Sequence, residues 1–517
     1  MQTICQRLLL FDGFVYTDAM RRFERSRKDA VVWILIVSAV LFSGAHSVQG
    51  ARAGAPIVIT GAQLPWGRVL PHDIVAFVHD NDWHQIPIQI DERDIREFSQ
   101  IYGAGYRGNP NIGVFGIGAT EEVYCDPNTF TGADLDPTLD ANDELVFMMQ
   151  DAGIRATTDE RPPATQQGSG VEIEILDPLT QKMVYVYLFL QDGSLDPSSG
   201  TSYVDYDFHL LSGDYKMTYN TAGNDEQTGL RNDDRGEQLN PEDSVIRTAV
   251  YERHWSYRWT CDSLSLFGGP SLVEREDYWI APGACGRHMG TFNAQEGAFI
   301  ANISGPVRAI RSYLGANSGP LVQVDRIYYQ AREDVAIYVR VHPRPSVGMF
   351  YVDHTLAAIG MTYANDLNPH GALIDGKPDH LTLGPISWEL VSGEPGSIVR
   401  LHDTKTDIAF DTDDFTLFYV DEVDTDLTLC EACVEGCPQP QRLGDRNLIG
   451  ASGVWNTAPL PNTDPALLAT QTLTTRITMY YGDSTWTTTD AADRRLWSDA
   501  PVEIQITTWP ESGSQSL

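Results

Sequence analysis

Apolar residues recur at every second position through most of the chain. The pattern is clear in PIVIT at 56–60, GVEIEIL at 170–176 and DVAIYVRVH at 334–342. A period of two places successive side chains on opposite faces of a strand, so the pattern predicts β-strands. No stretch keeps the 3.6-residue period of a helix over three turns, and turn-forming segments separate the runs. The sequence therefore predicts an all-β protein.

The spacing of the runs predicts a large antiparallel β-sandwich or supersandwich with long loops, with room for a smaller β-sandwich domain before it. Segment 157–170 is rich in Pro, Gln and Gly and is the predicted boundary. Residues 54–156 would then form the N-terminal sandwich, and residues 171–517 the large domain. Segment 222–243 is charged and nearly free of apolar residues, which predicts an insertion loop that is either a lid or a disordered segment.

Residues 20–53 follow the order of a secretory signal peptide. Five Arg and Lys residues between 21 and 28 precede an apolar run at 30–42, and Ala-Arg-Ala at 51–53 supplies a cleavage motif. A membrane span needs about 20 apolar residues, so this run is short, although an uncleaved anchor is the alternative. We assign residues 1–53 to upstream sequence and signal peptide. We expect a secreted, periplasmic or cell-surface protein with no membrane span after cleavage.

The formal net charge is −35. A chain this acidic repels phosphate, and no basic patch offsets the repulsion, so the sequence excludes nucleic acid as a partner. The same charge favours high solubility and the binding of cations.

A dense group of acidic and amide side chains leads into the apolar run ELVFMM at 144–149. Its members are Asp134, Asp136, Asp140, Asn142, Asp143 and Glu144. Ca²⁺ takes six to eight oxygen ligands, often several from one acidic loop. The tract is not an EF-hand, because it lacks the required Gly and Glu and contains Pro137.

We predict that four members of this tract hold one structural Ca²⁺ ion. The predicted ligands are Asp134, Asp136, Asp140 and Asn142. The alternative is a solvated acidic turn whose side chains cap backbone amides.

Six cysteines follow the predicted signal peptide, and an even count in an exported chain indicates disulfide bonds. They are Cys125, Cys261, Cys285, Cys430, Cys433 and Cys437. Cys261 and Cys285 enclose a single loop and are predicted to pair. Cys125 is predicted to pair with one member of the Cys-rich segment 430–437. A metal site with four thiolate ligands is the alternative for this second group.

Alternate residues of YERHWSYRW at 251–259 combine aromatic rings with Arg. In a strand, Tyr251, Arg253, Trp255, Tyr257 and Trp259 would share one face, and His254 would lie on the other. Such faces line sugar-binding clefts, and they also fill the cores of β-sandwiches.

An enzyme that eliminates across an acidic polysaccharide must neutralise a carboxylate, remove a proton and protonate the leaving oxygen. The candidates for these catalytic roles are Tyr251, Arg253 and His254, and the candidates for substrate contact are Trp255, Tyr257 and Trp259. His370 and Lys377, in the Gly- and Pro-rich loop 368–380, are further candidates for substrate binding; a hydrated surface turn is the alternative there.

Two segments resemble known carbohydrate-related families. ISGPVRAIRSYLG at 303–315, followed by QVDRIYYQAREDVAIYVRVH, resembles the central strands of the β-supersandwich in polysaccharide lyases and galactose-mutarotase-like proteins. ITGAQLPWGRVL at 59–70, followed by WHQIPIQID, is similar to the opening of exo-rhamnogalacturonan lyase-like proteins. The chain departs from that family where ANDELVFMMQDAG stands in place of a DGSVKW-type segment. The resemblance implies a supersandwich fold and assigns no catalytic residue.

Two functional classes fit these observations. The first is an exported, calcium-stabilised acidic protein that binds polysaccharide or cell-surface glycan, or builds a surface structure. The second is a polysaccharide lyase or another carbohydrate-active enzyme acting on acidic polysaccharide. The sequence contains no GxSxG, HExxH or P-loop motif and no convergent acid–base set, which favours the first class.

Overall fold

The computed structural model describes most of the chain after the predicted signal peptide. The described residues are 52, 54–97, 120–129, 131–209, 243–255, 263–282, 297–315, 322–339, 346–406, 415–424, 447–456 and 473–510. All of them belong to one compact unit, Arg52–Leu517. Antiparallel sheets dominate this unit, so the predicted all-β sandwich class is confirmed. Within the described residues, no helix is long and apolar enough to cross a membrane.

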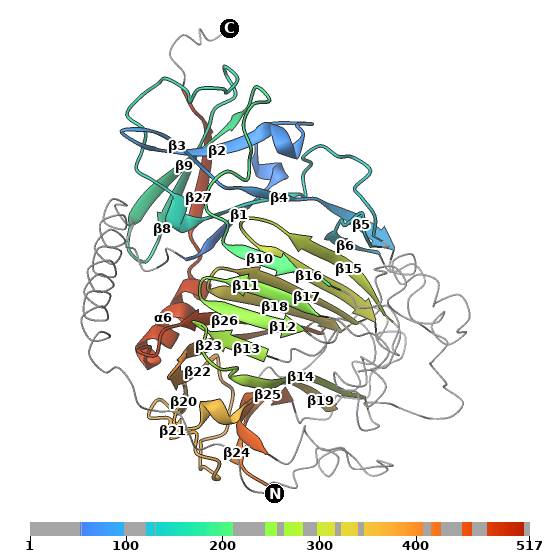
Figure 1. Ribbon diagram of the computed structural model, residues 1–517, viewed down its shortest axis with the longest axis vertical. Coiled ribbons are helices and arrows are strands. Elements are labelled where there is room, and N and C mark those ends of the chain that lie inside the picture. The colour runs from blue at the N-terminus through green and yellow to red at the C-terminus, as the bar shows by residue number, and fades with distance from the viewer. Residues whose placement is uncertain are drawn as a thin grey trace, which may run out of the picture. The chain divides into compact units, whose positions relative to one another are not determined.

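A nine-stranded sheet forms the centre of the molecule (Figure 1). Its strands, in spatial order, are β15 (Gly297–Ser304), β16 (Ala309–Gly315), β17 (Val322–Tyr329), β18 (Arg332–Val339), β26 (Leu473–Gly482), β23 (Gly396–Thr406), β22 (Trp388–Gly393), β20 (Thr362–Asn365) and β21 (Ala372–Leu373). The segment that resembles lyase and mutarotase-like proteins falls on β15 to β18.

Two four-stranded sheets pack on one face of the nine-stranded sheet. The first contains β10 (Val204–Asp207), β11 (Ser244–Thr248), β12 (Tyr251–Trp255) and β13 (Ser263–Leu266). The second runs in the order β14 (Val273–Pro282), β19 (Ser346–His354), β25 (Leu448–Asn456) and β24 (Phe415–Glu422).

The large hydrophobic core lies between these layers. Leu264, Val454 and Ile477, one from each sheet, belong to the same buried cluster. The opposite face of the nine-stranded sheet is covered in part by α6 (Thr488–Asp499), whose Ala491 packs with Trp388. Because both faces are covered, the strands of the central sheet carry buried residues at odd and even positions alike.

The N-terminal strands belong to three smaller sheets, one of which also contains strands from later in the chain. A five-stranded sheet runs in the order β27 (Glu503–Thr508), β8 (Val171–Asp177), β9 (Lys182–Leu190), β2 (Ile74–Asp80) and β3 (Asp82–Ile86). A three-stranded sheet contains β1 (Pro56–Thr60), β7 (Glu144–Met148) and β4 (Gln89–Asp91), and a ribbon contains β5 (Arg93–Glu97) and β6 (Thr120–Tyr124).

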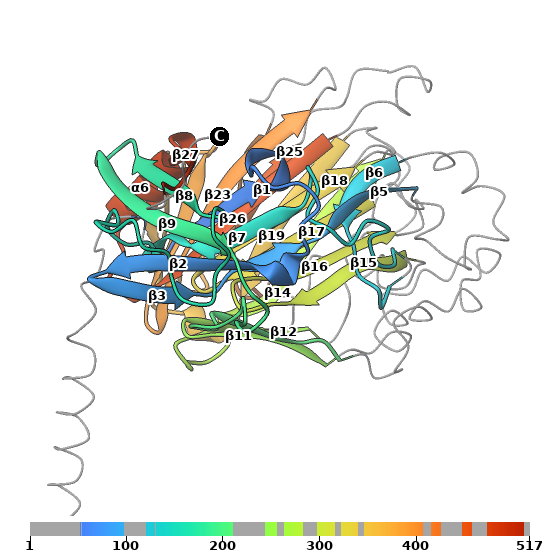
Figure 2. The same ribbon diagram turned by 90° about the horizontal axis from the view of Figure 1, so that it is seen from above.

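Strand pairing crosses the boundary that the sequence predicts at 157–170. β2, from the predicted N-terminal part, pairs with β9, from the predicted large domain. β27, near the end of the chain, pairs with β8 in the same sheet (Figure 2). The two predicted parts therefore share a sheet. The predicted insertion loop 222–243 lies outside the described residues, except for Asp243 at its end.

The GPVRA segment joins the central sheet to the N-terminal strands. The Gln89 side chain accepts hydrogen bonds from the backbone N–H groups of Val307 and Arg308, at 3.3 and 3.0 Å. A Cβ atom at Gly305 would lie 2.1 Å from the Gln89 side-chain oxygen, so only glycine allows this approach. The motif thus places β4, and the residues that follow it, beside β16.

Candidate cation site

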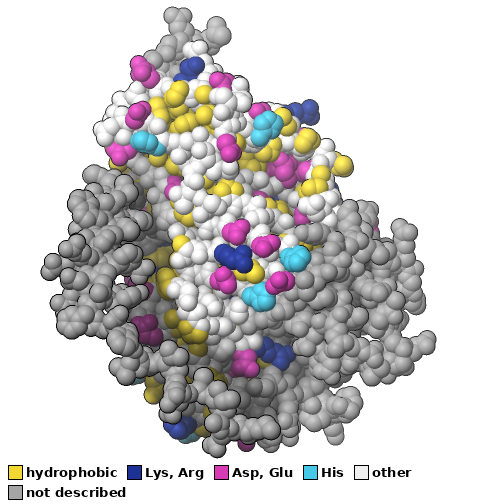
Figure 3. Space-filling view, viewed as in Figure 1, with side chains coloured by type: hydrophobic (Ala, Val, Ile, Leu, Met, Phe, Trp, Pro, Cys, Tyr) yellow, Lys and Arg dark blue, Asp and Glu magenta, His cyan; other side chains and the backbone are white. Residues whose placement is uncertain are grey.

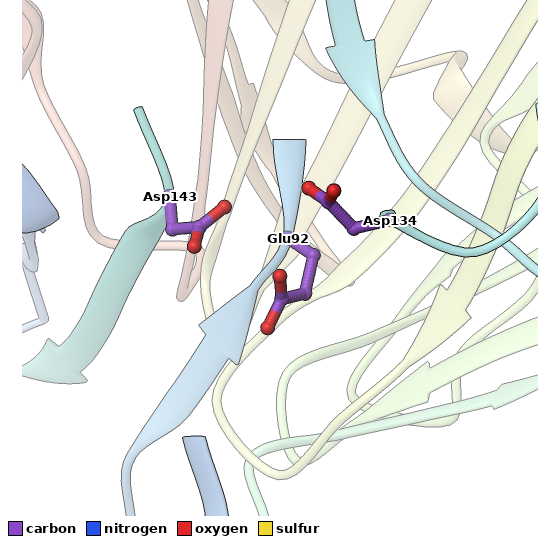
Figure 4. Close-up of side chains that lie close together, drawn as sticks. All are labelled: Glu92, Asp134 and Asp143. Carbon is purple, nitrogen blue, oxygen red and sulfur yellow. The ribbon is translucent and has the colours of Figure 1, made fainter. Parts of the chain in front are cut away.

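Three carboxylates converge just beyond the three-stranded sheet. Glu92 lies between β4 and β5, Asp134 lies in the loop between β6 and β7, and Asp143 immediately precedes β7. One carboxylate oxygen from each of the three lies within 4.8 Å of the others. Figure 4 shows the side chains gathered around a common centre. Carboxylate oxygens are ligands of the kind that Ca²⁺ takes, so the three groups could supply part of a coordination shell.

Asp143 is held in place by backbone donors. Its Oδ1 accepts a hydrogen bond from the Arg93 N–H, and its Oδ2 accepts one from the Asp140 N–H, both at 2.8 Å. The side chain has no exposed surface, and burial raises its pKa. Asp143 therefore fixes the turn that leads into β7.

Glu92 and Asp134 each have an oxygen that is shielded from solvent and accepts no hydrogen bond from the described residues. These atoms are Glu92 Oε2 and Asp134 Oδ2. Burial, together with the charges of Asp143 and Asp134, raises the pKa of Glu92 to about 7. Shielded carboxylate oxygens normally have a partner, and a bound cation would supply one here.

The alternation of side chains along the strands separates this cluster from a second acidic pair. Asp91 and Glu144 are directly paired between β4 and β7 and lie one residue from Glu92 and Asp143. Both contact the buried Arg308 guanidinium, at 2.7 Å each. Asp91 and Glu144 are therefore neutralised by an arginine, while Glu92, Asp134 and Asp143 form a separate group that shares none of these ion pairs.

Asp134 alone of the predicted calcium ligands belongs to the cluster. Asp136 is exposed, and its Oδ1 accepts hydrogen bonds from the hydroxyl and N–H of Thr138, which lower its pKa. Asp140 accepts a hydrogen bond from the Asn142 N–H at 3.1 Å, and Asn142 donates to the Arg93 carbonyl at 3.1 Å. These three side chains cap or brace the backbone, as the alternative interpretation describes.

Sequence reasoning missed Glu92 because it is distant from the acidic tract along the chain. Pairing of β4 with β7 brings it to Asp143. A lone Glu after the strand QIPIQID carries no local signal, whereas Asp143 was visible within the tract and was not selected as a ligand.

Cys125 is buried beside the cluster. Its N–H donates to the Glu92 carbonyl at 2.9 Å, and its Sγ accepts a contact from Arg96 Nη2 at 3.8 Å. Burial raises the pKa of the thiol to about 12, so it remains protonated at neutral pH. Cys125 forms no disulfide in the structure. The other five cysteines of the predicted disulfide set lie outside the described residues, so both predicted pairings and the thiolate metal site stay predictions.

The predicted catalytic face of β12 lies in the interior. Tyr251, Arg253 and Trp255 share one face, as expected, but their exposed fractions are 2%, 0% and 0%. The Trp255 ring packs between the guanidinium groups of Arg311 and Arg326, at 4.6 and 4.8 Å. The face covers the nine-stranded sheet and is inaccessible to a polysaccharide in this structure. Tyr257 and Trp259 lie outside the described residues.

His254 lies on the opposite, outer face of the same strand. Its Nε2 is 2.8 Å from Asp243 Oδ1. Nearby, the exposed Arg247 forms ion pairs with Asp205 and Glu252. Figure 3 shows acidic, basic and His side chains gathered over β10 to β12. This face is solvated and of mixed charge, and it presents His254 without Tyr251 or Arg253.

His370 and Lys377 lie in an exposed loop between β20 and β22. The Lys377 ammonium group contacts the Asp375 carboxylate, at 2.6 Å, within one turn. The turn is anchored by Asp421, whose Oδ2 accepts hydrogen bonds from the N–H groups of Asp375 and Gly376. These contacts match the hydrated surface turn that the sequence left as an alternative.

No protein-family model matches the chain, and no curated protein matches it. Among solved structures, the chain is similar to an alpha-mannosidase from Enterococcus faecalis V583, with 9% sequence identity and a TM-score of 0.39; the match covers 96% of this chain and 51% of that chain. It is also similar to a putative aldose 1-epimerase from Escherichia coli K12, with 7% identity and a TM-score of 0.22, over 46% of this chain and 97% of that chain.

The chain thus spans about half the length of the mannosidase that it matches. Similarities at these TM-scores carry no argument about substrate or activity. The class of protein is defined by the strands themselves: an all-β sandwich of antiparallel sheets.

Proposed function

We propose that this protein is an exported, calcium-stabilised β-sandwich protein of the cell surface or extracellular space. Its role would be to bind glycan or to build a surface structure. The observation that carries the calcium part is the cluster of Glu92, Asp134 and Asp143, in which two shielded oxygens have no hydrogen-bond partner among the described residues. The resemblance of residues 303–315 to lyase and mutarotase-like strands motivates a glycan as the partner.

The chemistry of the cluster suits a hard divalent cation. Carboxylate oxygens are the ligands that Ca²⁺ prefers, and backbone carbonyls and water commonly complete its shell. The three carboxylates come from three separate segments, so an ion between them would tie the end of β4 and the loop after β6 to the start of β7. Its role would be structural, because it would bind the folded arrangement and not the unfolded chain.

The calcium proposal predicts a stability change that depends on two residues. Ca²⁺ should raise the melting temperature, and at a hundredfold excess over Kd the free energy of unfolding should rise by about 2.7 kcal/mol. Glu92→Gln combined with Asp134→Asn should remove the difference between calcium and chelator. Differential scanning calorimetry of both proteins in calcium and in chelator measures this.

Matched controls are available in the same chain. Asp136→Asn and Asp196→Asn each change one exposed carboxylate that caps its own turn, so both variants should keep the full calcium response. If Asp136→Asn abolished the response while the Glu92 and Asp134 variant retained it, the ligand set would be wrong. A wild-type melting temperature that is indifferent to calcium would contradict the site itself.

The proposal also predicts that acidic polysaccharides are not cleaved. Tyr251 and Arg253, the candidates for proton transfer and carboxylate neutralisation, are buried in the core. Incubation with a panel of acidic polysaccharides should produce no absorbance from an unsaturated product. Steady accumulation of that product would replace the proposal with the lyase alternative.

A further inference from the structure

Among the described residues, one edge of the five-stranded sheet ends in a strand with no pairing partner on its outer side. β27 (Glu503–Thr508) pairs with β8 on its inner side and is the terminal strand of the sheet. No described residue outside β8 pairs with its backbone. Figure 2 shows β27 beyond β8, at the end of the sheet opposite β3.

The direction of each backbone group on β27 follows from one hydrogen bond. The Trp509 N–H donates to the Gly170 carbonyl of the β8 side at 2.9 Å. Because backbone groups alternate along an antiparallel strand, Glu503, Gln505 and Thr507 also face β8. The N–H and C=O groups of the intervening residues, Ile504, Ile506 and Thr508, therefore point outward.

β27 has few of the features that usually protect an edge strand. Its sequence, EIQITT, contains no Lys and no Pro. Its register with β8 is continuous from Glu503 to Thr508, without a bulge. Ile504 and Ile506 are only partly buried. Regular, unprotected edges with β-branched residues readily add another strand.

The outer edge of β27 is complementary to itself. A two-fold axis perpendicular to the sheet and beside Ile506 would pair Ile506 with its own copy and Ile504 with Thr508 of that copy. In this register, all six outward groups on each strand form hydrogen bonds, and residues directly opposite lie on the same face. If the two-fold axis lay beside Gln505 instead, no β27 residue of the second copy would lie opposite the outward N–H and C=O groups of Thr508.

Charge also permits this pairing between two acidic molecules. Glu503 is the one charged residue on β27, and in this register it lies opposite Trp509 of the second copy. Ile506 would pack against Ile506 of the second copy. On its inner side, the same residue is paired with Ile173 of β8. No like charges meet along the strand, so the cross-strand contacts themselves add no repulsion between the two copies.

We propose that β27 is a dimerisation strand through which two copies of this chain join their five-stranded sheets into one continuous antiparallel sheet. At the opposite edge of the sheet, β3 lies beside the loop that contains Asp196, whose carbonyl accepts a hydrogen bond from the Gln85 side chain. The pairing is independent of the calcium cluster, whose three residues lie between strands elsewhere in the fold.

Sedimentation velocity over a range of concentrations tests the proposal. The purified protein should form a dimer in a concentration-dependent manner. Ile506→Pro should weaken the dimer about tenfold or more, because it removes the outward N–H at the axis and leaves the bonds to β8 intact. Ile506→Lys should have a similar effect, because it places two ammonium groups opposite one another.

Gln505→Lys is the matched control. Its side chain lies on the other face and opposite Thr507 of the second copy, so the dimer should persist. Circular dichroism and melting curves establish that each variant is folded. Hydrogen exchange gives an independent readout, since the amides of Ile504, Ile506 and Thr508 should exchange more slowly as protein concentration rises.

Three results would overturn the proposal. The first is a wild-type protein that stays monomeric at every concentration, with amides on β27 that exchange equally fast throughout. The second is a dimer that survives both Ile506→Pro and Ile506→Lys. The third is growth of open-ended fibres, which would indicate pairing of β27 with a different edge strand of the next copy.

Discussion

Replacing Glu333 by Gln should lower the free energy of unfolding by about 3–5 kcal/mol. Glu333 has no exposed surface and lies on β18 in the large core. Its Oε2 is 2.7 Å from Arg253 Nε and accepts a hydrogen bond from the Tyr481 hydroxyl at 2.8 Å. Its Oε1 is 2.8 Å from Arg326 Nη1.

The cost is large because positive and negative charges are equal in number in this network and all of its charged groups are buried. Glu276, also without exposed surface, forms ion pairs with the same two arginines. Two guanidinium groups are thus matched by two carboxylates between the sheets. Glu333→Gln keeps the shape and removes one negative charge, which leaves the buried Arg253 and Arg326 with a single carboxylate in the core.

Asp334→Asn is the control for the Glu333 experiment. Asp334 is the next residue, points to the other face, and pairs with Arg332 at 2.8 Å where both side chains are about a quarter exposed. An ion pair of this kind contributes about 0.2–1 kcal/mol. Urea denaturation of both variants and the wild type gives the comparison. Equal losses for the two variants would show that the buried network is not what holds the sheets together.

Acidification should destabilise the protein through a second buried network. His354, on β19, is buried, and its Nδ1 lies 3.1 Å from the Gly450 carbonyl. Burial and the nearby charge of Arg400 lower the pKa of His354 from 6.5 to about 4. Above pH 6.5 the histidine is neutral in both states. Between pH 6.5 and 4 the unfolded chain binds a proton that the folded chain does not, so stability falls as the pH falls.

The expected loss from His354 alone is about 3 kcal/mol across that window. Glu389 extends the loss to lower pH. Burial by itself would raise its pKa, but the charge of Arg400 and the hydrogen bond from His402 lower it from 4.5 to about 2. This carboxylate is favoured in the folded state, and its contribution is lost as the pH falls from about 4.5 to 2.

Comparison with His354→Gln isolates the histidine from the other titrating groups. Glu92 acts in the opposite direction, since its raised pKa of about 7 adds stability as the pH falls toward 4.5. Urea denaturation of both proteins at several pH values between 7.5 and 4 gives the difference curve. The variant should lose less stability than the wild type over this range, and parallel curves would contradict the assignment.

The alternation along β12 shows what local sequence determines. A period of two put Tyr251, Arg253 and Trp255 on one face, and the structure agrees. Whether that face meets solvent or a second sheet depends on layers built from residues far along the chain. Aromatic rings with arginines occur in both settings. Only the packing of β12 over β17, β18 and β26 decided that these groups form a core.

In the carboxylate cluster too, local sequence determined one part of the arrangement and tertiary pairing the other. The acidic tract before β7 predicts a calcium site formed by Asp134, Asp136, Asp140 and Asn142, with a solvated turn as the alternative. In the structure, the last three side chains form hydrogen bonds with the backbone, which for Asp136 and Asp140 lie within the tract. Glu92 belongs to the cluster because β4 and β7 pair. Its neighbour Asp91 forms an ion pair with Arg308 on the other side.

The sequence by itself determined the strands, the turns between them and the faces that side chains share, because these follow from the backbone period and from contacts within a few residues. The tertiary structure alone decided which faces are buried and which carboxylates pair with Arg308. It also decided that β27, near the end of the chain, completes the sheet of β8 and β9. Those outcomes depend on pairing between distant segments, and a local pattern does not contain the identity of its partner.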